Sequence, residues 1–218
     1  MARILRVDAS ARTERSLSRK LGDEFIANWS ELSGTPKIIV RDVGKTPPPI
    51  ISEDWIAAVF SQEMTPEQQA LTKTSDELIA EVAAADMILI TTPMYNYGMP
   101  AALKAWFDQV VRINKTFTFD LARGDRPLEP ILPGKPIVAL TSWGEFGFGP
   151  GELNDGGDNL VPHLRVASRY LGASGFHHVG IEYQEFGDAR HERSKADARR
   201  AVRDLVLRLS QQHAPEAA

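Results

Sequence analysis

Thr-Thr-Pro-Met-Tyr-Asn-Tyr-Gly-Met-Pro-Ala-Ala-Leu-Lys-Ala-Trp-Phe, residues 91–107, is the stretch that decides the fold. A short apolar run, residues 87–90, precedes it and is typical of a buried strand, and a helical pattern follows it. The segment between them combines two tyrosines, an amide, a glycine and two prolines. Ligands of open α/β sheets bind outside the carboxyl ends of the strands. We therefore predict that this loop holds a flat heterocycle, with Asn96 contacting its polar edge.

Strands and helices alternate along the rest of the chain, which predicts a parallel sheet covered by helices on both faces. The expected strands are residues 4–8, 37–42, 87–92, 136–142 and 177–183. The expected helices begin near Leu17, at 52, at 66, after Pro100, at 160 and at 191. Residues 116–133 have no regular pattern. We predict a doubly wound, flavodoxin-like α/β fold with strand order 2-1-3-4-5, because the loops after the first and third strands hold the unusual residues.

The composition favours one soluble, cytoplasmic domain. The chain has 218 residues, 43% of them hydrophobic, and a net charge of −4. We assign residues 1–212 to one domain and expect a disordered tail at 213–218. The absence of cysteine excludes thiol chemistry and fits a reducing compartment. The mild acidity argues against nucleic-acid binding, and no apolar run suits a membrane span.

The loop after the first strand is rich in hydroxyl groups and opens a helix. Ser10, Ser16 and Ser18, with free backbone amides at the helix start, are suited to bind an anion such as a phosphate monoester. Arg12 would add positive charge at the rim. Serine is also a preferred N-cap, so Ser16 or Ser18 would serve equally well as a cap. The position after the first strand of an α/β sheet favours the anion site.

Several other site classes are absent from the sequence. No Gly-x-Gly-x-x-Gly follows the first strand, and there is no P-loop and no Gly-x-Ser-x-Gly elbow. The five histidines show no metal-binding spacing with carboxylates, so we expect no metal site. No residue stands out as a catalytic acid, base or nucleophile.

Together these segments resemble the FMN-dependent NADH azoreductase and quinone oxidoreductase family, a flavodoxin-like group of small homodimeric enzymes. The likeness spans roughly the whole chain, and the Pro-Met-Tyr-Asn run is its most specific part. Four stretches carry it: Ser10 with Ser16-Leu17-Ser18, residues 93–100 with Leu103-Lys104 and Asp108, residues 112–119, and residues 141–144.

The resemblance implies roles for particular residues. The FMN phosphate would lie at Ser10, Ser16, Leu17 and Ser18. The isoalloxazine would lie on Met94, Tyr95, Asn96 and Tyr97, and its other edge would meet Ser142, Trp143, Gly144 and Glu145. This last loop departs from the family, which often has Ser-Arg-Gly-Gly there. An acid at Glu145 facing flavin N1 would disfavour a negatively charged reduced flavin. Phe117 and Phe119 would wall a substrate pocket, with core or interface packing equally open.

The resemblance also implies a mechanism. One non-covalent FMN per subunit would take a hydride at N5 from NADH or NADPH and pass two electrons to a quinone or azo compound in ping-pong fashion, with no catalytic residue required. A homodimer would complete the site. Two alternatives remain open: a flavodoxin-type electron carrier and a non-catalytic flavin-binding regulatory subunit.

Overall fold

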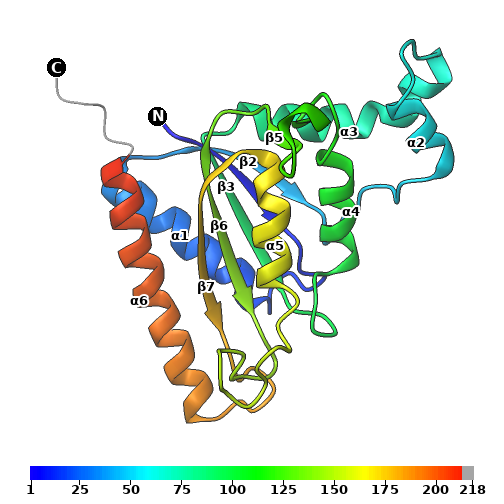
Figure 1. The fold of residues 1–218 in the computed structure, drawn as a ribbon. Coiled ribbons are helices and arrows are strands. Elements are labelled where there is room, and N and C mark those ends of the chain that lie inside the picture. Colours follow the sequence, from blue (N-terminus) through cyan, green and yellow to red (C-terminus); the bar gives the residue numbers. More distant parts are fainter. Residues whose placement is uncertain (213–218) are drawn as a thin grey trace.

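A five-stranded parallel sheet runs through the middle of the protein (Figure 1). The computed structural model describes residues 1–212, so the predicted disordered tail, 213–218, lies outside the described residues. The strands are β1 (Arg3–Asp8), β2 (Lys37–Asp42), β3 (Met87–Pro93), β6 (Lys135–Ser142) and β7 (Ala173–Ile181). Their spatial order is β2-β1-β3-β6-β7, which confirms the predicted order 2-1-3-4-5.

Helices cover both faces of this sheet, as Figure 1 shows. On one face α1 (Leu17–Ser33) and α6 (Ala189–Gln212) lie side by side. On the other face lie α3 (Pro66–Ala84), α4 (Ala101–Val110) and α5 (Val161–Ser168). The short helix α2 (Glu53–Val59) lies at the outer side of α3. No helix among residues 1–212 is long and apolar enough to cross a lipid bilayer.

The alternation of side chains along each strand divides the core into two clusters. Ile88 and Ile90 of β3 face α3, α4 and α5, whereas Met87 and Leu89 face α1 and α6. A strand buried on both faces reads as a continuous apolar run, because successive side chains point to opposite sides. This is why residues 87–90 were recognisable as a central strand.

Two segments differ from the sequence prediction. Residues 116–133 form an antiparallel hairpin, β4 (Phe117–Phe119) with β5 (Leu128–Pro130), around the short 3₁₀ helix η1 (Leu121–Arg123). The last strand begins at Ala173, four residues before the predicted start. Ala173 and Gly175 pair with β6, whereas Ser174 falls at a shift in the register between them. This irregularity and the low strand propensity of glycine hide the start of the strand. The 3₁₀ helix η2 (Arg169–Leu171) ends immediately before, at Gly172, which has a positive φ of 72°.

Candidate functional site

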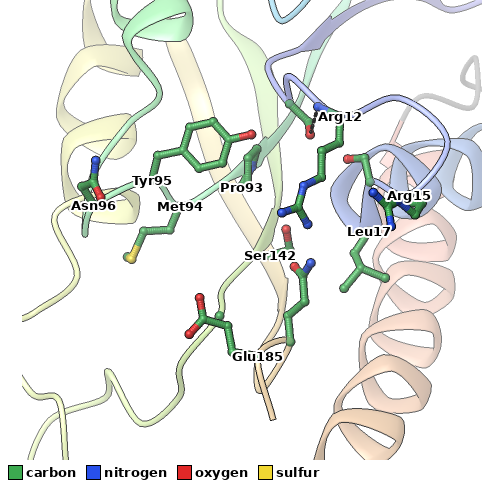
Figure 2. A pocket seen from close by; sticks show the side chains of 13 residues that line it. Arg12, Arg15, Leu17, Pro93, Met94, Tyr95, Asn96, Ser142 and Glu185 are labelled. Atoms are coloured by element: carbon green, nitrogen blue, oxygen red, sulfur yellow. Dashed lines mark hydrogen bonds between the residues drawn. The ribbon is translucent and has the colours of Figure 1, made fainter. Parts of the chain in front are cut away.

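A cleft of about 620 Å³ opens at the carboxyl ends of β1, β3 and β6. Four loops contribute to it, one after each of these strands and one after β7. Figure 2 shows the side chains that line it. They are Ser10, Arg12, Arg15, Ser16, Leu17, Pro93, Met94, Tyr95, Asn96, Ser142, Gly144, Gln184 and Glu185. The structure thus brings together residues from all three predicted segments.

The loop after β1 forms the first wall. Ser16 is the N-cap of α1, and its Oγ accepts a hydrogen bond of 3.3 Å from the Arg19 amide. Ser16 thus caps the helix and also lines the cleft. Ser18 differs: its hydroxyl is fully buried, 3.2 Å from Ser16 Oγ, and does not line the cleft.

Positive charge gathers at this end of the cleft. Arg12 and Arg15 both line it, and Figure 2 shows the Arg12 side chain extending from the loop into the cleft. The first turn of α1 adds the positive end of its dipole, and no protein acceptor within residues 1–212 faces the backbone amides of Leu17 and Ser18. Arg15 was missed because neither spacing nor hydropathy distinguishes it from a solvated loop arginine.

The second wall is a tight turn after β3. The Tyr95 and Gly98 backbones exchange two hydrogen bonds of 3.1 and 3.0 Å. The two central residues, Asn96 and Tyr97, both have positive φ angles, 48° and 62°, as a type I′ turn requires. Asparagine tolerates this conformation, but tyrosine is strained in it. The strain thus falls on Tyr97, one residue before Gly98.

Contacts beyond the turn hold Tyr97 in place. Its carbonyl accepts from the Asn159 amide at 3.0 Å, and its hydroxyl donates to the Glu145 carboxylate at 3.0 Å. This hydrogen bond, together with the negative charge of Glu145, raises the pKa of the Tyr97 phenol. Tyr97 and Glu145 do not line the main cleft. They line an adjoining hollow of about 170 Å³ that shares Met94, Asn96 and Gly144 with it.

The third wall is the loop after β6. Ser142 and Gly144 line the cleft, but Trp143 between them is buried and points elsewhere. Its ring packs against His178, with the ring centroids 5.2 Å apart, and against Phe148 at 5.9 Å. Successive residues of an extended segment point to opposite sides, so Ser142 and Trp143 cannot face the same ligand. The structure therefore does not bring Trp143 to the cleft.

The loop after β7 forms a fourth wall, through Gln184 and Glu185, which were not predicted from the sequence. Three backbone hydrogen bonds join this loop to residues 143–145: Tyr183 N to Glu145 O, Gln184 N to Trp143 O, and Glu185 N to Gly144 O. The Glu185 side chain packs so closely on Gly144 that a Cβ there would lie 2.8 Å from its carboxyl carbon. Figure 2 shows Glu185 at the opposite end of the cleft from Arg15.

Phe117 and Phe119 are not brought to this cleft. They lie in the hairpin that leads into the start of β6, whereas the cleft lies at the strand's other end (Figure 1). Phe117 packs edge-on against Tyr170 at 5.0 Å between ring centroids, and Phe119 is half exposed. Within residues 1–212 no group of three or more His, Asp or Glu side chains could hold a metal ion.

Comparison with known proteins shows the family to which the chain belongs. A family model described as the flavodoxin-like fold matches residues 2–206. FMN-dependent NADH:quinone oxidoreductase 2 of Colwellia psychrerythraea is 51% identical over 218 residues, covering 96% of this chain and 100% of the relative. The chain belongs to the flavodoxin-like family of FMN-dependent NADH:quinone oxidoreductases. A member of this family from Idiomarina loihiensis is 49% identical, covering 96% of this chain and 91% of its own length.

Solved structures share the family's fold. The crystal structure of an azoreductase from Bacillus anthracis str. Sterne matches with a TM-score of 0.83 and 21% identity, over 95% of this chain and 100% of that one. An FMN-dependent NADH-azoreductase from B. anthracis str. Ames Ancestor, in complex with FMN, also has a TM-score of 0.83, at 20% identity, over 96% of this chain and 100% of that one. At this identity the likeness concerns the fold.

Proposed function

We propose that this protein is an FMN-dependent oxidoreductase that transfers two electrons from NADH or NADPH to quinones and azo compounds. The observation that carries the proposal is the cleft itself, which combines a cationic end at a helix start with a rigid aromatic turn at the ends of β1 and β3. Relatives that are 49–51% identical and carry the name FMN-dependent NADH:quinone oxidoreductase support it.

The donor set fits the phosphate of FMN. Ser10 and Ser16 supply hydroxyls, the Leu17 and Ser18 amides supply backbone donors, and Arg12 and Arg15 supply charge. Amides at a helix start and arginine side chains are the groups that bind phosphate in proteins. Ser18 would contribute through its backbone amide, because its hydroxyl is buried behind Ser16.

The remaining walls fit a planar ring. Pro93, Met94 and Tyr95 supply apolar surface along one side, and Asn96 supplies an amide at the polar edge. Ser142 and Gly144 would face the ring's other edge, with Tyr97 and Glu145 just beyond it. The positive φ angles of Asn96 and Tyr97 fix the direction of the turn's backbone amides before any ligand arrives.

When bound, FMN would supply the redox chemistry, accepting a hydride at N5 from the nicotinamide and giving two electrons to the acceptor. The chain's own groups would bind the cofactor, orient it and leave one face open to donor and acceptor in turn, a ping-pong scheme. We assign no catalytic acid or base to the chain. The acidic groups nearest the ring, Glu145 and Glu185, would set the electrostatic environment of its edge.

The test is anaerobic reduction of the FMN-reconstituted protein. Addition of NADH is expected to bleach the visible flavin absorption in one two-electron step, and a quinone is expected to restore it. Repeating the addition with NADPH identifies the preferred donor. Bound FMN that neither donor bleaches would overturn the enzyme assignment and favour an electron carrier or a regulatory flavoprotein.

A further inference from the structure

Arg19 lies directly beneath the loop between β1 and α1 and uses every donor that it has. It is 8% exposed and does not line the cleft. A guanidinium group carries five N–H donors in a fixed fork. Nε donates to the Arg12 carbonyl at 3.0 Å, and Nη2 donates to the Ser10 carbonyl at 2.7 Å. The other three donors are taken by the carboxylates of Asp8 and Asp42.

The two carboxylates fix the guanidinium to the sheet. Asp8 and Asp42 are register partners at the carboxyl ends of β1 and β2, and Asp42 accepts from both Nη atoms, at 2.8 and 2.7 Å. Asp8 is itself held by the Thr91 hydroxyl at 2.6 Å and by Arg6 Nε at 2.8 Å. The two carboxylates balance the two guanidinium groups of Arg6 and Arg19, so this cluster is close to neutral. Arg19 therefore acts on the cleft by fixing the backbone of the loop and not by adding positive charge.

That geometry determines where the loop's amides point. The peptide bond is planar and trans, so the N–H that follows each carbonyl points the opposite way. With the Ser10 and Arg12 carbonyls held toward Arg19, the amides of Ala11 and Thr13 point away from it. The Ala11 amide indeed faces the cleft, because its nearest partner is the hydroxyl of Tyr95 on the opposite wall, at 3.4 Å.

Gly44 supports the same carbonyl from a second side. It follows β2, and a Cβ added there would lie 2.2 Å from the Ser10 oxygen and 3.0 Å from Arg19 Nη2. The nearest obstacle is backbone, so the loop itself would have to move. The Ser10 peptide is thus enclosed between Arg19 and Gly44, and its orientation depends on both.

We propose that Arg19 is a positioning residue that sets the backbone amides of Ala11 and Thr13 for the phosphate of the cofactor, and so makes the cleft select a phosphorylated flavin over the unphosphorylated one. This rests on the proposed function. Arg19 touches neither the ring-binding turn nor the loop after β6. Loss of Arg19 is therefore expected to weaken the binding of FMN. The binding of riboflavin, which has no phosphate, is expected to stay almost unchanged.

The experiment compares the dissociation constants of FMN and riboflavin, measured by flavin fluorescence on the full-length apoprotein, for the wild type and three variants. Arg19→Lys keeps the charge but cannot form the five-donor fork. Gly44→Ala displaces the Ser10 carbonyl and changes no charge. Arg41→Lys is the matched control, since Arg41 is on β2 and pairs with Glu81 away from the loop. Arg19→Lys and Gly44→Ala are expected to weaken the binding of FMN at least tenfold and the binding of riboflavin less than threefold. Arg41→Lys is expected to leave the ratio of the two dissociation constants unchanged.

A ratio of FMN to riboflavin affinity that stays at the wild-type value in folded Arg19→Lys would overturn the proposal, as would an equal loss for both flavins. If Arg19→Lys does not fold, Asp42→Asn replaces it and is judged by the same ratio. The outcomes separate the two proposals. A wild type that binds FMN but is not reduced by NADH or NADPH overturns the enzyme assignment and not the role of Arg19, and a wild type that binds no FMN overturns both.

Discussion

Single residues explain why this cleft is shaped before a ligand arrives. Asn96 and Tyr97 adopt the left-handed conformation in the turn after β3. Arg19 holds two carbonyls of the loop between β1 and α1. The sequence predicted Asn96 and Tyr97 as site residues because of their neighbours. The positive φ of Tyr97 was not predictable, because tyrosine disfavours it and the Glu145 contact that holds it comes from 48 positions away in the chain. The buried role of Arg19 was not predictable, because the carboxylate that anchors it, Asp42, lies 23 positions away.

A first prediction at this scale concerns Glu145. Its carboxylate accepts a hydrogen bond from the Tyr97 hydroxyl, beside the cleft. Negative charge there would oppose the negative charge that a bound flavin gains on reduction. Glu145→Gln is expected to raise the midpoint potential of the bound FMN. The measurement is anaerobic redox titration of the reconstituted protein. Glu152→Gln is the control, because it removes an acid of the same loop that lines neither the cleft nor the adjoining hollow. An unchanged or lower potential in Glu145→Gln would contradict the prediction.

A second prediction concerns His178, whose ring lies against Trp143 and Thr141. Burial lowers the pKa of His178 to about 4; the charge of Asp158 raises this pKa slightly, and the charge of Arg165 lowers it slightly. Between pH 6.5 and about 4 the unfolded chain binds a proton that the folded chain does not, so stability falls as the pH falls through this window. The shift is worth up to about 3 kcal/mol.

His178→Gln is expected to remove the part of the stability loss on acidification that comes from His178. The measurement is the difference in unfolding free energy between pH 7 and pH 4.5, by urea denaturation of both proteins. The variant keeps a hydrogen-bonding group for Thr141, so its stability at pH 7 serves as the internal control. Equal losses of stability in the two proteins on acidification would show that His178 does not carry the effect.

At the scale of elements, the sequence predicted most of the architecture because two periodicities are strong. A continuous apolar run marks β3, and four-residue spacing marks α1. The predicted start of β7 was wrong because a glycine and a serine lie there. The hairpin was missed because each of its strands has only three residues. Gln184 and Glu185 were missed for a related reason. Nothing in their own sequence shows that they are hydrogen-bonded to the loop after β6.

A prediction at this scale concerns how β7 packs on the loop after β6. At Gly180 a Cβ would lie 2.3 Å from the buried Trp143 ring, which cannot move without repacking its neighbours. Gly180→Ala is expected to destabilise the protein by about 1–3 kcal/mol. Gly144→Ala is the control, because its obstacle is the exposed Glu185 side chain, and it is expected to cost less than about 0.5 kcal/mol. Equal urea midpoints for the two variants would contradict this account.

At the scale of the whole molecule, the described chain leaves apolar surface around α2. Ile50, Ile56 and Phe60 are 85%, 45% and 67% exposed, close together in the chain. Contiguous apolar patches of this kind mark interaction sites, and most soluble oligomers are symmetric dimers. We propose that this surface joins two copies of the chain and that the dimer completes the cleft.

The protein is therefore expected to sediment as a dimer at micromolar concentration in analytical ultracentrifugation. Phe60→Asp is expected to shift it toward the monomer with an unchanged circular dichroism spectrum. Leu207→Asp is the matched control, since Leu207 is also exposed but lies on α6, on the other face of the sheet. A wild-type monomer, or equal effects of the two variants, would contradict the proposal.

The opposite charges at the two ends of the cleft have a consequence for how any ligand enters it. Arg15 lies at one end, from which the Arg12 side chain reaches into the cleft, and Glu185 lies at the other, with Glu145 just beyond. A molecule with an anionic tail that entered reversed would bring its negative group against two carboxylates and leave both guanidinium groups without a partner. The cleft thus enforces one direction of insertion. This directional choice is electrostatic, so it weakens as salt shortens the range over which the charges act.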